Sequence, residues 1–390
     1  MIPQGYKQTE IGVIPEDWDC VAAKHLMKIE TGSRNTEHKT DIGKYPFFVR
    51  SQKVERIDTY HYDCEAVLTA GDGVGTGKVF HHYIGKFDAH QRVYVMSNFD
   101  GITGRYFYNY FSENFGNEVS KYTAKSSVDS VRRDMIAEML IPTPTILEQK
   151  RIAEALSDAD SMISSLEKLI AKKKAVKQGA MQELLTGKKR LPGFTGEWYE
   201  TTIGEHCCVF DGTHQTPKYT LAGIPFYSVE NVTANDFVNT KFITTEEHEQ
   251  LSSKCKIEKG DILMTRIGSI GDCKYIDWDV NASFYVSLAL IKCKETINAQ
   301  FLSFYSTSSY FKKEIEIRSL LTAIPQKINL GPISEIRLNI PSDIKEQEAL
   351  ASILSDMDNE IEALEQKLKK TRQIKQGMMQ QLLTGKIRLV

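Results

Sequence analysis

The chain has 390 residues, of which 41% are hydrophobic and 26% are charged, and its formal net charge at pH 7 is −2. These values suit a globular protein with more than one core, and they exclude a disordered or collagen-like chain. The near-neutral charge also argues against a protein that grips nucleic acid by charge alone, so any such binding would need local basic patches or charge from a partner.

Signals for targeting and for metal binding are missing. The start Met1-Ile2-Pro3-Gln4-Gly5 is not a basic-then-apolar signal region, and no run approaches the roughly 18 apolar residues of a membrane helix. We therefore expect a cytoplasmic protein with no membrane contact. The seven cysteines form no CxxC pair and do not alternate with His at zinc spacing, which predicts neither a disulfide framework nor a metal site.

The first predicted domain spans residues 1–142 and is rich in strands, because short apolar runs such as Val93-Tyr94-Val95 are bounded by Gly, Asp and Asn. The stretch 103–121 is predicted to be a helix, and we interpret its aromatic cluster around Tyr106 and Phe111 as core rather than as a base-stacking platform. The glycine-rich run 71–78 fails the phosphate-loop pattern, since position 72 is Asp and position 79 is Val. We interpret it as a turn between strands.

Residues 143–190 contain the first long predicted helix. Thr145-x-x-Glu148 fits a capping box, in which the threonine caps free amides and the glutamate reaches back, and Gly187 fits a left-handed helix stop. Apolar residues at alternating spacings of four and three form a coiled-coil seam. The seam residues of this helix are Ile152, Leu156, Ile163, Leu166 and Ile170.

The second predicted domain, residues 191–341, is a diverged relative of the first. Ile224-Pro225-Phe226-Tyr227 echoes Tyr45-Pro46-Phe47-Phe48, and Leu263-Met264-Thr265 echoes Val67-Leu68-Thr69. Residues 342–390 then contain a near-copy of the first helix, with 21 identities in 41 positions between 148–188 and 346–386. Its seam residues are Leu350, Leu354, Ile361, Leu364 and Leu368.

The charge pattern predicts how the two helices lie. Each begins acidic and ends basic, so an antiparallel pair places each acidic start beside the basic end of the other. The expected fold is α+β: two pseudo-symmetric, strand-rich α/β domains separated by two long antiparallel coiled-coil helices.

No catalytic signature survives inspection. The Asn-Pro-Pro-aromatic and Asp-Pro-Pro-aromatic tetrapeptides of amino-methyltransferases are absent, and the nine histidines form no HExxH or base–nucleophile pattern. The residues therefore indicate a binder rather than an enzyme. Two other interpretations stay open at this point: a coiled-coil assembly adaptor with two domains for ligands other than DNA, and a catalytic fragment with an unrecognised site.

The Pro144-to-Gln149 helix start, the Lys-Gln-Gly-x-Met-Gln-x-Leu-Leu-Thr-Gly-Lys helix end, and the repetition of the whole after a second domain resemble the specificity subunit of type I restriction–modification enzymes. The resemblance covers essentially the whole chain and is strongest in the helices. It implies two target-recognition domains that each read half of a bipartite double-stranded DNA sequence, with the helices setting the spacer. It further implies that the helices dock two modification subunits, which bring S-adenosylmethionine and methylate adenine, and that restriction subunits join to cleave; this chain itself would hold no cofactor.

Candidate DNA contacts are polar and basic residues in the predicted loops, because such side chains read base edges and phosphates. In the second domain the family pattern Thr-Arg-x-Gly stands at Thr265-Arg266-Ile267-Gly268, whereas the first domain has Thr69-Ala70, which puts an equivalent arginine there in doubt. The candidates of the first domain are Arg50, Gln52, Lys53, Lys78, Gln91, Arg92, Lys125, Arg132 and Arg133. Those of the second are His214, Gln215, Lys218, Asn231, Arg266, Ser269, Gln326 and Lys327.

Overall fold

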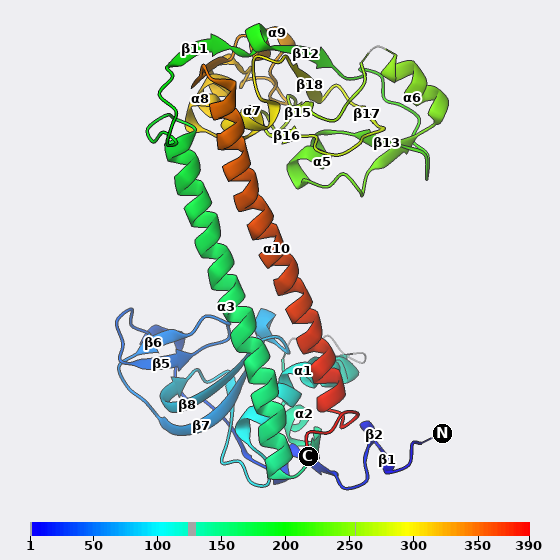
Figure 1. Cartoon of the computed structure of the whole chain (residues 1–390). Helices are drawn as coiled ribbons and strands as arrows, with labels where there is room; N and C mark the ends of the chain where they lie inside the picture. The colour runs from blue at the N-terminus through cyan, green and yellow to red at the C-terminus, as the bar shows by residue number, and fades with distance from the viewer. Residues whose placement is uncertain (1, 124–129, 254) are drawn as a thin grey trace. The chain divides into compact units, whose positions relative to one another are not determined.

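The computed structural model describes residues 2–123, 130–253 and 255–390 (Figure 1). The chain divides into two compact units: unit 1 contains residues 1–168 and 365–390, and unit 2 contains residues 169–364. Each unit therefore holds one strand-rich part together with one stretch of each long helix.

Unit 1 is built on a six-stranded sheet of order β4-β9-β7-β8-β5-β6. Neighbouring strands are antiparallel except β5 and β8, which run parallel with Phe47 opposite Asp88. The strands of this sheet are β4 (Lys28–Thr31), β5 (Tyr45–Phe48), β6 (Glu55–Ile57), β7 (Tyr62–Ala70), β8 (Phe80–Ala89) and β9 (Val93–Ser97). Two smaller antiparallel pairs are β1 (Tyr6–Thr9) with β2 (Gly12–Pro15), and β3 (Asp19–Ala22) with β10 (Leu140–Thr143).

The core of unit 1 lies beneath α1 (Gly104–Thr123), which contributes a stack of fully buried aromatic rings. Phe107 and Phe111 lie 5.1 Å apart between ring centroids, and Phe111 and Phe115 lie 4.4 Å apart. The interpretation of this cluster as core is thus confirmed. The remaining short helices of the unit are η1 (Ala23–His25), η2 (Thr36–His38), η3 (Gly73–Gly75) and α2 (Arg133–Ala137).

Unit 2 repeats this plan with its sheet divided into a four-stranded part of order β12-β18-β15-β16 and a three-stranded part of order β14-β13-β17. A separate pair joins β11 (Trp198–Thr202) to β19 (Arg337–Pro341). The strands of the two parts are β12 (Cys207–Asp211), β13 (Ile224–Tyr227), β14 (Lys241–Ile243), β15 (Ile262–Thr265), β16 (Cys273–Tyr275), β17 (Ser283–Phe284) and β18 (Leu288–Cys293). The short helices are α4 (Ile203–His206), α5 (Val229–Ala234), α6 (Thr245–Ser252), α7 (Ala299–Tyr305), α8 (Ser309–Arg318) and α9 (Leu330–Ser334).

Backbone pairing shows that the two units are diverged copies. Phe48 accepts the N–H of His90 at 2.9 Å, and Tyr227 accepts that of Tyr285 at the same distance, in each case beside a parallel strand pair. The single strand β8 of unit 1 corresponds to β16 and β17 of unit 2, which are separated by residues 276–282. That interruption is what divides the sheet of unit 2.

The two long helices are α3 (Ile146–Leu184) and α10 (Ile344–Leu382). Both end as predicted, since Gly187 and Gly385 each have φ of 69°, in the left-handed region that favours glycine. At the start of α3 the N–H of Glu148 donates to Thr145 Oγ1 at 3.3 Å, which confirms the threonine cap. The second half of the capping box was wrong, because the Glu148 carboxylate binds the side chains of Arg388 and Trp18 instead of the backbone N–H of Thr145.

Within each unit the stretches of α3 and α10 pack antiparallel, as the charge pattern predicted. In unit 1, Lys375 binds Asp160 at 2.6 Å and Arg372 binds Glu167 at 2.6 Å. In unit 2, Lys173 binds Glu360 at 2.6 Å and Lys177 binds Asp358. Residue numbers rise along one helix as they fall along the other, which fixes the direction.

The seam residues are mostly buried, but not all against the partner helix. Ile152 and Leu156 belong to the core of unit 1, and Leu350 and Leu354 belong to the core of unit 2. Leu166, Ile170 and Ile361 are also buried, whereas Ile163, Leu364 and Leu368 are half-buried. The start of each seam therefore anchors a helix to a unit.

Candidate nucleic-acid interface

Two exposed arginines of unit 1 meet at one carboxylate just after the end of β7. Asp72 Oδ1 accepts a hydrogen bond from Arg50 Nη1 at 2.8 Å, and Asp72 Oδ2 accepts one from Arg92 Nη1 at 2.8 Å. Partial burial by itself would raise the pKa of Asp72, but the hydrogen bonds and charges of the two arginines outweigh it and lower the pKa. Asp72 is thus a fixed anion that orients two cations. We call these three residues the Asp72 cluster.

The backbone holds both arginines against the glycine-rich turn. The N–H of Gly71 donates to the carbonyl of Arg92 at 2.8 Å, and a Cβ at Gly75 would lie 2.6 Å from the carbonyl oxygen of Arg50. The N–H of Arg92 donates to Nδ1 of His90 at 3.0 Å, so that nitrogen carries no proton. Burial, and then the charge of Arg50, lowers the pKa of His90, which favours this neutral ring.

The remaining candidates of unit 1 differ in their surroundings. Gln52, Lys53, Lys78 and Gln91 are exposed, and Lys53 lies 3.3 Å from Glu55. Arg132 and Arg133 are exposed at the start of α2, where Arg133 Nε donates to the carbonyl of Ile29 at 3.3 Å. Lys125 lies outside the described residues.

Arg266 of unit 2 lies in the interior rather than on the surface. Its side chain is 8% exposed, and Nη1 binds Asp211 Oδ1 at 2.5 Å. The same guanidinium donates to the carbonyls of Ile328 and Val286, each at 3.2 Å. These bonds join three chain segments at the end of β12, so Arg266 supports the fold here; contact of this residue with DNA stays a prediction.

The second side chain that contacts Asp211 is exposed. His214 Nε2 lies 2.7 Å from Asp211 Oδ2, and the histidine side chain is 71% exposed. His214 and Gln215 line a cavity of about 560 Å³ together with Asp211, Gln250 and Ser283. Unit 2 thus also carries a carboxylate that binds two nitrogen-bearing side chains at a strand end, although only one of them reaches the surface.

The other candidates of unit 2 are distributed around these strand ends. Asn231 is buried and caps α5, accepting the N–H of Ser228 at 2.9 Å and donating to the carbonyl of Asp236 at 2.9 Å. Ser269 is exposed and donates to Asp272 Oδ2 at 2.5 Å. Lys218 and Gln326 are exposed, and Lys327 is half-buried. Structurally, then, Asn231 supports a helix start, while the other four lie at or near the surface.

The strand pairings place Arg266 one residue away from the position that the sequence echo suggests. The N–H of Arg266 donates to Ser287 and its carbonyl accepts from Ile328, as Gly71 donates to Arg92 and accepts from Val131. Gly71, rather than Ala70, is therefore the counterpart of Arg266. A side chain cannot fit there, because a Cβ would lie 2.9 Å from the carbonyl oxygen of Arg92.

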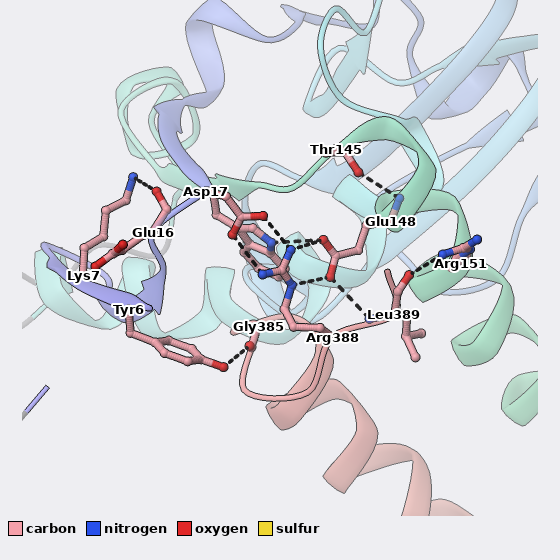
Figure 2. A network of polar contacts seen from close by, with 11 residues as sticks. Tyr6, Lys7, Glu16, Asp17, Thr145, Glu148, Arg151, Gly385, Arg388 and Leu389 are labelled. Carbon is pink, nitrogen blue, oxygen red and sulfur yellow. Dashed lines mark hydrogen bonds and ion pairs between the residues drawn. The ribbon is translucent and has the colours of Figure 1, made fainter. Parts of the chain in front are cut away.

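Sequence reasoning missed a pair of ion clusters that fasten the helix starts. In unit 1, Arg388 donates to Glu148 Oε1 at 2.7 Å and to Asp17 at 2.8 and 2.9 Å, and Trp18 Nε1 donates to Glu148 Oε2 at 3.2 Å (Figure 2). We call this the Arg388 latch. Hydrogen bonding to Glu148, and then to Asp17, raises the pKa of Arg388, and hydrogen bonding to Arg388 lowers the pKa of Asp17.

Unit 2 contains the corresponding ion pair, with Arg190 binding both oxygens of Glu346 at 2.6 and 2.7 Å. Its tryptophan differs from that of unit 1, because Trp198 Nε1 is buried without a hydrogen-bond partner. Glu148 and Glu346 are each only 1% exposed. The available signal was the repeat itself, since an Arg-Leu pair follows each helix stop, at Arg190-Leu191 and Arg388-Leu389.

The described part of the chain contains no group of three or more His, Cys, Asp or Glu side chains that could hold a metal ion. None of its helices combines the length and the apolar character that crossing a membrane requires.

The fold is that of a duplicated protein: two α+β units of one plan, fastened to two long helices by equivalent ion clusters, with polar and basic side chains at the strand ends. The model of the type I restriction modification DNA specificity domain matches residues 15–178 and 197–374. The chain belongs to this family. It is the DNA specificity subunit, a non-catalytic component, of a type I restriction–modification system. The two other interpretations of the sequence, an assembly adaptor for ligands other than DNA and a catalytic fragment, are therefore wrong.

Two relatives from one organism match over nearly their full length. The chain is 25% identical over 432 residues to the putative type I restriction enzyme MjaX specificity subunit of Methanocaldococcus jannaschii, covering 99% of this chain and 97% of that protein. It is 25% identical over 411 residues to the MjaVIII specificity subunit of the same organism, covering 96% and 94%. The crystal structure of the S subunit from M. genitalium superposes with a TM-score of 0.67 at 18% identity, covering 94% of this chain and 96% of that one, which shows the shared fold.

Proposed function

We propose that each unit reads one half of a bipartite double-stranded DNA target, and that the helices α3 and α10 fix the spacing between the halves. The observation that supports this division is the pseudo-repeat. The two units share one strand order, and the helices have stayed near-copies. The polar side chains at the strand ends differ, because Asp72 binds Arg50 and Arg92 after β7, whereas Asp211 binds Arg266 and His214 at the end of β12. A constant frame with two variable surfaces suits a protein whose two half-sites are chosen independently.

The domain boundaries for this function are those expected from the sequence. Residues 1–142 and 191–341 are the two target-recognition domains, and residues 143–190 and 342–390 are the spacer helices. The DNA contacts are drawn from the exposed candidates at the strand ends, with Arg50 and Arg92 foremost in unit 1 and His214 and Gln215 foremost in unit 2.

The partners are two modification subunits, which dock on the helices and supply S-adenosylmethionine for adenine methylation, and restriction subunits, which add cleavage. The exposed outer faces of α3 and α10 support this docking, because the helices carry charged side chains beyond those in the ion pairs between them. The chain itself supplies the address and the scaffold.

The test is to sequence the methylated positions in the genome of a host that expresses this chain with its modification subunit. We expect one bipartite adenine-methylated motif. Replacing residues 1–142 with those of a relative should change one half of the motif and leave the other half and the spacer unchanged. A motif that is not bipartite, or an exchange that alters both halves, would contradict the proposal.

A further inference from the structure

The Asp72 cluster has properties that suit contacts to base edges rather than contacts to phosphates. Its two arginines stay accessible, with side-chain exposures of 47% for Arg50 and 61% for Arg92, while Asp72 is only 16% exposed. Each guanidinium gives Asp72 one nitrogen, Nη1, and an arginine has five N–H donors in all. Both arginines therefore retain donors beyond the ones that hold them in place.

The charge balance of the cluster favours bases over phosphates. A phosphate contact gains mainly from net positive charge, and a carboxylate bound to both guanidinium groups cancels part of that charge. What Asp72 supplies instead is orientation. Two long side chains that are already held in one geometry lose less conformational freedom on binding, and a bidentate contact depends on such geometry.

Backbone contacts fix the cluster further. Arg50 and Arg92 come from different loops, yet both rest on the glycine-rich turn, through Gly75 and Gly71 respectively. Val74, at the tip of that turn, is 99% exposed, so nothing in the described chain covers this end of the sheet at that point. Among the described residues, the cluster is thus held by side-chain and backbone contacts and stays accessible.

Resting on the proposed function, we propose that Arg50 and Arg92 each bind the O6 and N7 acceptors of a guanine in the major groove, and that Asp72 is the positioning residue for both. Guanine offers two acceptors that match the arginine fork. Because both arginines bind one carboxylate, the two guanines occupy adjacent or next-adjacent base pairs, which are stacked about 3.4 Å apart. The half-site of unit 1 therefore contains two G·C pairs that are adjacent or separated by a single base pair, and we call such pairs neighbouring. Among its described residues, unit 2 has no such pair of accessible arginines at the equivalent strand end, because Arg266 is buried there.

The experiment uses the full chain with its modification subunit, and the exchange of residues 1–142 first assigns one half of the methylated motif to unit 1. That half should contain the two neighbouring G·C pairs. Arg50→Ala and Arg92→Ala should then each relax a different one of these positions, with discrimination against the wrong base falling roughly 5- to 150-fold. Asp72→Asn should relax both positions together, because it removes the anion that orients both arginines.

Controls separate base reading from general effects. Lys86→Ala removes an exposed charge at the opposite end of the β7–β8 ladder, beside Asp63. This variant should discriminate between bases at both positions as well as wild type does. Continued strict reading of the unit 2 half by the same molecules shows that each variant is folded and assembled.

Two results would overturn the inference while leaving the proposed function intact. One is a bipartite motif whose unit 1 half lacks neighbouring G·C pairs. The other is a set of variants that methylate all sites more weakly, to the same extent, with no position relaxed; this would mark Arg50 and Arg92 as phosphate contacts. A motif that is not bipartite would instead remove the proposed function itself.

Discussion

At the scale of single residues, the two units differ most in what their carboxylates hold. Asp72 holds two accessible arginines, whereas Asp211 holds the buried Arg266 and the exposed His214. Neither carboxylate stands out in the sequence, because the partners of Asp72 are 20 and 22 residues away and Arg266 is 55 residues from Asp211. Local patterns predict helix ends well but carry little information about such distant pairs.

Arg266 offers the first prediction at this scale. Arg266→Ala should lower the free energy of unfolding by about 2–4 kcal/mol, because it leaves Asp211 Oδ1 and two carbonyls without their arginine donor in a mostly buried site. Chemical denaturation monitored by circular dichroism measures this. Lys218→Ala, at an exposed position of the same unit, should change the value by less than about 0.5 kcal/mol. An Arg266→Ala protein as stable as wild type would mean that the arginine serves DNA contact rather than the fold.

His90 offers a second prediction, on pH. Its pKa is lowered from the ordinary 6.5 by burial and by Arg50, so the unfolded chain binds a proton there more readily than the folded one does. The contribution of His90 to stability is therefore complete above pH 6.5 and is lost as the pH falls through the lowered pKa. His90→Asn keeps an acceptor for the Arg92 N–H without titrating.

Unfolding midpoints at pH 7.5 and 5.5 test this difference. The His90→Asn protein should lose less stability between the two values than wild type does. Some loss should persist, since burial also lowers the pKa of His81 and His206. An equal loss in both proteins would show that folding does not lower the pKa of His90.

At the scale of elements, the long helices were the most predictable part of the chain. The apolar spacing predicts the seam, the glycines predict the stops at Gly187 and Gly385, and the charge pattern predicts the antiparallel direction. These signals are local in the sequence, and each occurs in both copies of the helix. Strand alignment between the units was predicted less well. The echo of Thr69 with Thr265 is one residue out of register with the backbone pairing, because a match of residue types says nothing about which hydrogen bonds form.

The Arg388 latch is an element-scale device that fastens the C-terminal segment to the start of α3, and it can be tested against a matched exposed pair. Arg388→Ala should cost about 2–4 kcal/mol, because it leaves the Glu148 carboxylate, 1% exposed, with a single side-chain donor in Trp18. Arg372→Ala removes an ion pair to Glu167 whose side chains are 58% and 47% exposed, and it should cost less than about 1 kcal/mol. Urea unfolding of both variants gives the comparison, and equal costs would refute a special role for the latch.

At the scale of the whole molecule, charge limits what the chain does alone. The formal net charge of −2 leaves little general attraction for DNA, and part of the basic charge is bound within the Asp72 cluster and between the helices. A partner that adds phosphate contacts would supply the missing electrostatic contribution. The specificity subunit would then contribute discrimination between sequences more than affinity.

The final prediction follows from this division. At about 150 mM salt the isolated chain should bind its own target little better than random DNA, with Kd near the roughly 10⁻⁴ to 10⁻⁶ M of non-specific binding. With modification subunits present, specific binding should tighten by at least about 10³-fold, and the dependence of affinity on salt should become steeper because more phosphates are contacted. Fluorescence anisotropy across a salt series measures both quantities on one labelled duplex. The isolated chain could instead bind its target tightly, with the same salt dependence as the complex. In that case the units make their own phosphate contacts, and the argument that the Asp72 cluster orients arginines rather than supplying net positive charge loses its main support.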